Sequence, residues 1–178
     1  MYGWLLLVVA VLVAVGAWLI WTANRLDRLH HRIDVGRGRL DAQLLRRSGV
    51  TLELAASDAL DPASRLLLLD AAHHARSAAP GEAEAAESAL SEALRAVFGW
   101  PDDVQVLRAE PHVAPLLDEL AAASAKVELV RRFHNNDVVS ARELRSRHWV
   151  RRLHLAGRAG VLQTVDLDDV PPAALVAA

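Results

Sequence analysis

The chain has 178 residues and no cysteine, which fits one small domain and excludes disulfides, thiolate metal sites and a cysteine nucleophile. Apolar residues make up 53% of the chain, which excludes disorder over its whole length. The 20 basic and 22 acidic residues give a net charge of −2, and aromatic residues make up only 4%, so nucleic acid is a poor candidate partner.

The nearly neutral total conceals a charge pattern along the chain. Residues 1–22 carry no charged side chain, residues 23–47 carry +4, and residues 53–128 carry −9. Residues 131–158 then carry +6, and the three acids of the last segment give −3. Two basic blocks therefore flank an acidic middle.

Residues 2–22 form an uncharged apolar run that is long enough to cross a bilayer as a helix. Trp4 lies near one end of this run, and Trp18 and Trp21 lie near the other, as expected for indoles at the two membrane interfaces. A cleaved signal peptide with a cut near Val15–Ala17 is the alternative, but the run continues past that point and lacks a basic start. We therefore expect a single transmembrane helix.

Basic residues follow the apolar run at once, and none precedes it. The positive-inside rule predicts an N-terminus outside the cell and a cytoplasmic remainder. The expected location is the cell inner membrane, crossed once.

Apolar residues after the span recur every three or four positions, which predicts helices. The first helix is expected to continue unbroken from the membrane, with a heptad seam that also carries Gly36, Gln43 and Arg47; its apolar members are Leu26, Leu29, Ile33, Leu40, Val50 and Leu54. Asp61 followed by Pro62 predicts the start of a second helix that ends near Ala78.

A third, alanine-rich helix is predicted over Glu82–Phe98, and Gly99 with Pro101 should end it. The fourth is long: it should begin between Pro111 and Pro115 and continue to about Leu155. Its seam is predicted to contain Val113, Leu116, Leu120, Ala123, Val127, Val130, Ala141 and Leu144. The fold class is thus all-α, an antiparallel up-and-down four-helix bundle over residues 23–156 that continues from the transmembrane helix.

Residues 157–178 differ in character from the predicted helices. Gly157 and Gly160 interrupt the helical pattern, residues 165–170 alternate weakly like a strand, and Pro171 with Pro172 prevents either element from continuing. We expect a flexible acidic tail outside the bundle. It is either a frayed terminus or a segment that adds to a partner's sheet through Val165, Leu167 and Val170.

Three segments share their order and their position after one membrane helix with a known family. They are Leu40–Arg47 (LDAQLLRR), Ala86–Leu94 (AESALSEAL) and Val127–Val138 (VELVRRFHNNDV). Over roughly residues 24–158 the chain resembles the LemA family, as a divergent member. The resemblance implies a four-helix bundle tethered with its N-terminus outside, and a molecular function that the family leaves unsettled.

No recognised catalytic or phosphate-binding motif occurs in the sequence. None of the eight histidines pairs with another at the i, i+4 spacing of a helical metal site, and Asp102-Asp103 is best explained as a helix cap. We therefore expect no enzyme activity, no metal and no cofactor.

A polar layer is predicted inside the otherwise apolar seam. If residues 24 and 154 both lie at the membrane, Gln43 faces Asn135 and Arg47 faces Arg131 on antiparallel helices. The predicted layer comprises Gln43, Arg47, Arg131, His134, Asn135 and Asp137. It either fixes helix register through hydrogen bonds or binds a small anion or a partner's carboxylate.

The same topology would bring the two basic blocks together beside the membrane. The predicted collar comprises Arg25, Arg28, Arg32, Arg37, Arg39, Arg142, Arg145, Arg147, Arg151 and Arg152. Contact with the anionic inner leaflet is the favoured role, and a plain solvated face is the alternative.

The expected function is a single-pass membrane-anchored scaffold or interaction module of the LemA type, with an unknown protein partner and with oligomerisation left open. The alternative is a small-molecule or anion-binding site, with or without hydrolytic activity, in the polar layer of the core.

Overall fold

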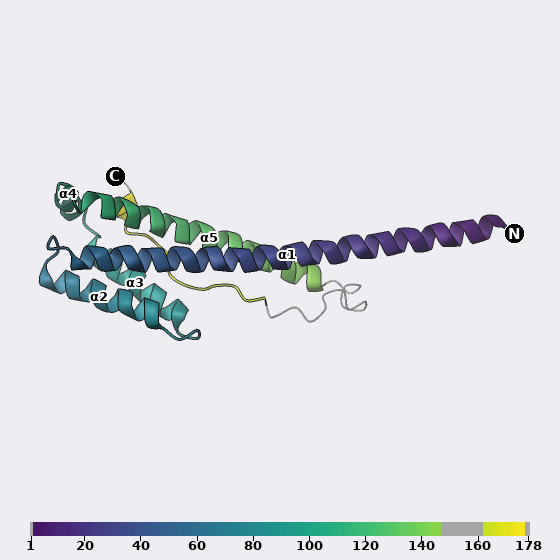
Figure 1. The fold of residues 1–178 in the computed structure, drawn as a ribbon, viewed down its shortest axis with the longest axis horizontal. Coiled ribbons are helices and arrows are strands. Elements are labelled where there is room, and N and C mark those ends of the chain that lie inside the picture. Colours follow the sequence, from purple (N-terminus) through teal and green to yellow (C-terminus); the bar gives the residue numbers. More distant parts are fainter. Residues whose placement is uncertain (1, 147–161, 177–178) are drawn as a thin grey trace. The chain divides into compact units, whose positions relative to one another are not determined.

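The computed structural model describes residues 2–146 and 162–176. Every regular element in these ranges is a helix, which confirms the all-α prediction. The helices are α1 (Tyr2–Ala56), α2 (Pro62–Ser77), α3 (Ala83–Val97), α4 (Pro101–Arg108), α5 (Ala114–Ser146) and α7 (Ala173–Val176) (Figure 1). The chain divides into two compact units, of which the first comprises residues 1–36 and 134–164 and the second residues 37–133 and 165–178.

Local sequence explains several helix ends. Asp61 accepts hydrogen bonds from the backbone N–H groups of Ala63 (2.9 Å) and Ser64 (3.1 Å), and Pro62 occupies the first turn of α2. The hydrogen bonds to this cap lower the pKa of Asp61. At α4, Trp100 is the N-cap and Asp102 with Asp103 lies in the first turn. The two acids therefore do not cap the helix; their charges suit its positive N-terminal end.

The first unit contains the apolar start of α1 and a small core farther along it. The most apolar window of α1 is long enough to cross a membrane, and none of it is buried in the structure. The core consists of Ile33, Val138, Ala141 and Leu162, with Leu29 packed against it.

Two polar contacts support the packing of the first unit. Arg32 and Asp137 form an ion pair at 2.9 Å. Arg142 donates from Nε and Nη2 to the backbone oxygen of Leu162, at 2.9 and 2.5 Å. These contacts join residues of α1 to α5 and α5 to the segment that begins at residue 162.

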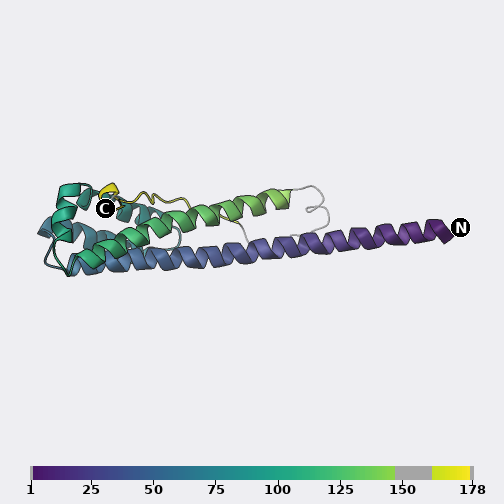
Figure 2. The ribbon, with the colours of Figure 1, turned by 90° about the horizontal axis from the view of Figure 1, so that it is seen from above.

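The second unit holds the larger core, to which all six helices contribute. In it, α2 and α3 lie side by side, and residues 114–133 of α5 lie along residues 37–56 of α1 (Figures 1 and 2). Its largest buried members are Leu54, Leu68, Leu90, Leu94, Phe98, Val104, Leu117, Leu120 and Leu175. Helix α4, where the sequence analysis expected a helix cap at Asp102-Asp103 but no full helix, adds Val104 to this core.

The C-terminal segment corrects the expectation of a flexible tail outside the bundle. Leu162, Val165, Leu167, Ala174 and Leu175 are all buried, and Leu175 belongs to the main core. Residues 165–170 form no helix or strand, although their exposure alternates as the sequence suggested. Val165 and Leu167 are therefore not available as anchors for a partner's sheet, because they already pack on helices of their own chain.

We expect Gly99→Ala to destabilise the full chain. A Cβ at this position would lie 2.6 Å from the backbone oxygen of Arg95, which is too close, and a backbone atom in the last turn of α3 would have to move. Chemical denaturation in detergent micelles, followed by circular dichroism, should show a loss of about 1–3 kcal/mol.

Gly81→Ala is the matched control, because nothing lies within 4 Å of a Cβ there. It should cause no loss of stability. Equal losses for the two variants would contradict the steric explanation.

Candidate functional site

Arg47 is the most deeply buried charge of the predicted polar layer, with 1% of its surface exposed. From α1 it points to α3, where Nη2 donates to the carboxylate of Glu87 at 2.7 Å and to the Glu87 backbone oxygen at 3.2 Å. Its Nη1 donates to the hydroxyl of Ser91 at 3.0 Å. The Arg47 side chain thus forms a buried hydrogen-bonded ion pair between two helices.

Glu87 is nearly as buried as its partner, with 6% of its surface exposed. Burial raises the pKa of its carboxyl group, although the charge and hydrogen bond of Arg47 act in the opposite direction. Glu87 also borders a pocket of about 330 Å³, whose lining includes Arg37, Asp41, Ser48, Arg76, Glu84, Val165 and Leu167.

Arg131 pairs with a residue that the sequence analysis placed in the free tail. Its Nε and Nη2 donate to the two carboxylate oxygens of Asp169, at 2.5 and 2.9 Å, in a bidentate ion pair. Asp169 is 5% exposed, and its hydrogen bonds raise the pKa of Arg131. Arg47 and Arg131 therefore do not face each other as a shared anion site; each has its own carboxylate.

The remaining members of the predicted layer are distributed between the two units. Gln43 is half-buried in the second unit. His134, Asn135 and Asp137 belong to the first unit, where Asp137 pairs with Arg32. His134 is 3% exposed, and its Nδ1 lies 3.5 Å from the place where a Cβ on Gly36 would be.

These contacts correct the predicted register. The residue of α1 beside His134 is Gly36, which lies seven residues before Gln43 of the predicted layer. In the second unit Leu40 clusters with Val127, and Arg46 pairs with Glu119 at 2.8 Å. The prediction assumed that residues 24 and 154 lie at one level, whereas the packing of the apolar seams sets the register.

The predicted collar residues have individual contacts. Arg25 lies over the ring of Trp21 at 5.8 Å, which is a cation–π distance, and Arg37 pairs with Asp41 at 3.2 Å. Arg32 pairs with Asp137, and Arg142 donates to the Leu162 backbone oxygen. Arg28 and Arg39 are exposed. Arg145 is half-buried in the first unit, and Arg147, Arg151 and Arg152 lie outside the described residues.

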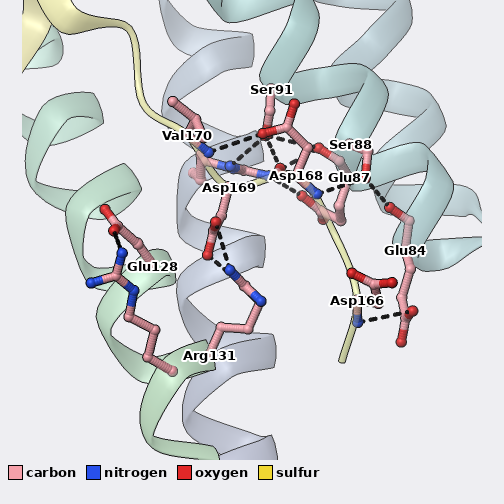
Figure 3. Close-up of polar contacts among 12 residues, drawn as sticks. Glu84, Glu87, Ser88, Ser91, Glu128, Arg131, Asp166, Asp168, Asp169 and Val170 are labelled. Atoms are coloured by element: carbon pink, nitrogen blue, oxygen red, sulfur yellow. Dashed lines mark hydrogen bonds and ion pairs between the residues drawn. The ribbon is translucent and has the colours of Figure 1, made fainter. Parts of the chain in front are cut away.

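The sequence analysis missed one site, the contact between α3 and residues 165–170. We call residues 165–170 the strap. Asp166 N donates to Glu84 Oε2 at 3.1 Å, and Asp168 N donates to Ser88 Oγ at 3.0 Å (Figure 3). Arg95 donates to the carboxylate of Asp168 at 3.1 and 2.5 Å, and to the backbone oxygen of Val170 at 2.9 Å. These three side chains of one helix therefore hold an extended segment of chain.

Ser91 connects this contact to the buried ion pair. Its Oγ lies 2.6 Å from the Asp168 backbone oxygen and 3.1 Å from that of Glu87. Because a hydroxyl has one proton, Ser91 donates to the nearer oxygen, on Asp168, and accepts from Arg47. Arg47, Ser91 and the strap thus form one chain of hydrogen bonds.

The distance between successive contact residues is similar on the helix and on the strap. Four residues of a helix advance by about 6.0 Å, and two residues of an extended chain advance by about 6.6 Å. Glu84 and Ser88 can therefore meet Asp166 and Asp168 in turn. Glu84, Ser88, Ser91 and Arg95 lie on one face of α3. We call these four residues, together with Arg131 of α5, the strap-binding face. Their spacing on an alanine-rich helix was the available sequence signal.

Replacing Arg47 with Leu should cost about 3–5 kcal/mol of unfolding free energy, because Glu87 would lose the partner of its buried charge. Arg46→Leu is the matched control: Arg46 is the neighbouring residue, and its pair with Glu119 is exposed, so the loss should be below about 1 kcal/mol. Denaturant titration of the full chain measures both. Adding Glu87→Leu to the first variant should recover part of the loss, and a further loss would contradict the ion-pair explanation.

The pH dependence of stability should separate Glu87 from Asp168. The pKa of Glu87 is raised, so the folded state binds this proton more tightly, and wild type should gain stability relative to Glu87→Gln as pH falls from neutrality towards the ordinary glutamate pKa. Arg95 lowers the pKa of Asp168, so that carboxylate stabilises the fold at neutral pH, and its contribution is lost below the ordinary aspartate pKa. Denaturation at several pH values should therefore give opposite slopes for Glu87→Gln and Asp168→Asn, each compared with wild type; parallel slopes would contradict the assignment.

Within residues 2–146 and 162–176, no cluster of three His, Asp or Glu side chains is arranged to hold a metal ion. Comparison of the chain with family models, with curated proteins and with solved structures gives no match. The resemblance to the LemA family therefore stays a prediction.

Proposed function

We propose that this chain is a single-pass membrane-anchored interaction module of the LemA type, with its N-terminus outside and its helical bundle in the cytoplasm. The observation that carries this proposal is the start of α1: an apolar window long enough to span a membrane, none of it buried, in a helix that continues without a break to Ala56. A soluble domain would leave this surface exposed to water at a large cost in free energy.

Orientation and location are inferred from charge. Five arginines follow the span between residues 25 and 39, and such residues remain on the cytoplasmic side of an inner membrane. The pairing of Arg25 with the ring of Trp21 suits a residue at the interface, where an indole and a cation are both stable. Arg28 is exposed and lies within two turns of the span, which suits contact with anionic headgroups.

An interaction role is favoured over a catalytic one by how the buried carboxylates are used. Glu87 and Asp169 are each held by an arginine, and Arg95 holds Asp168 at the edge of the same site. Carboxylates paired with arginines in this way stabilise a structure or hold a segment of chain. The alternative of an anion site in the polar layer has less support, since Arg47 and Arg131 already bind carboxylates of their own chain.

The proposal can be tested in intact cells and native membranes. A tag placed after Ala178 should be protected from external protease, and a tag placed before Tyr2 should be cleaved. Chemical crosslinking in the same membranes should give discrete adducts larger than the monomer.

Each part of the proposal has its own contrary outcome. A mature chain that begins near Trp18 would establish a signal peptide instead of an anchor. Protection of the N-terminal tag with cleavage of the C-terminal tag would reverse the orientation. Absence of adducts, with the topology as expected, would contradict the interaction role alone.

A further inference from the structure

The strap-binding face of α3 has the properties of a peptide-recognition site. Glu84 and Ser88 accept hydrogen bonds from strap N–H groups (Figure 3). Ser91 and Arg95 donate to strap carbonyl groups. These contacts are made with the backbone, so they suit any extended segment. They resemble the ladder of an added strand, with helix side chains in place of a sheet edge.

The preference of the strap-binding face for a particular ligand sequence comes from its contacts with side chains of the strap. Val165 and Leu167 point into a small apolar cluster with Leu40 and Val127. That cluster is separate from the main core of the unit, so its filling depends on the strap.

The two acids that follow are each matched to a cation. Arg95 binds Asp168, and Arg131 binds the buried Asp169. A suitable ligand therefore has the order apolar, any residue, apolar, acidic, acidic, in an extended conformation.

The charges around the strap include both repulsive and attractive pairs. Asp166 lies beside Glu84 of α3, so like charges oppose this part of the contact. Arg95 and Arg131 offset this repulsion, and the strap lacks the internal hydrogen bonds of a helix. An acidic segment held by two ion pairs can be exchanged for another segment with the same two charges.

We propose that the strap-binding face is a docking site for an extended acidic segment of a partner protein, and that the chain's own residues 165–170 occupy it until such a segment displaces them. This inference rests on the proposed role as an interaction module and names the chemistry of its partner. The strap then acts as an intramolecular competitor, whose effective concentration is on the order of millimolar.

The test uses the full chain in detergent micelles and, as probe, a fluorescent peptide of residues 162–176. The first variant, Asp168→Asn with Asp169→Asn, weakens the strap and leaves the strap-binding face unchanged. The second, Arg95→Gln with Arg131→Gln, breaks the same two ion pairs from the other side. The two variants are matched in the ion pairs that they lose; the second also loses the hydrogen bond from Arg95 to the Val170 backbone oxygen.

Fluorescence anisotropy should separate the two variants, although each lacks the same two ion pairs. The strap variant should bind the probe about tenfold or more tightly than wild type, because its own strap competes poorly. The face variant should bind it no better than wild type does. A probe with both aspartates replaced by asparagine should bind the strap variant at least about tenfold more weakly than the unmodified probe.

Other outcomes would overturn the inference. Equal binding by the two variants, or no binding by either, would show that residues 165–170 are a permanent part of the fold. Exchange of straps between two differently tagged wild-type copies, detected by crosslinking, would make a second copy the occupant and would overturn the proposal of a separate partner. If the peptide does not bind but the membrane adducts form, the docking site is contradicted and the interaction role stands. If the peptide binds but no membrane adducts form, the interaction role is contradicted and the docking site stands.

Discussion

Arg47 lies where α1, α3 and the strap come together, and its charge has to be matched there because almost none of its surface meets water. Glu87 supplies the opposite charge. Ser91 accepts a hydrogen bond from Arg47 and donates one to the backbone oxygen of Asp168. A guanidinium in this position tolerates few alternative arrangements, since any shift of α3 would leave a buried donor or carboxylate without its partner. The placement of the strap-binding face follows from this constraint.

The local features of the helices could be predicted from sequence. Asp61-Pro62 and Gly99-Trp100-Pro101 mark helix ends because capping and proline effects act over a few residues. The apolar run of residues 2–22 is equally local, and α1 is indeed a continuous helix. The burial of Leu40, Leu54, Leu120 and Val127 also follows the predicted seams.

The candidate site depended on distant partners and was largely missed. Arg47 and Arg131 were recognised as polar residues in an apolar seam, but their carboxylates come from α3 and from residue 169. Periodicity shows which face of a helix is buried and does not show which side chain lies opposite. The tail was misjudged for the same reason: its backbone hydrogen bonds are satisfied by side chains about 80 positions earlier, an arrangement that no local pattern reveals.

The order of residues in the strap has a consequence for its alignment. From Val165 to Asp168 apolar and acidic residues alternate, so a slide by two positions would again place an apolar residue in the apolar cluster and an acid beside Arg95. Asp169 breaks this alternation, because after such a slide Leu167 would stand against the guanidinium of Arg131. The second acid therefore acts as a stop that defines a single alignment, whereas an alternating segment without it would occupy several.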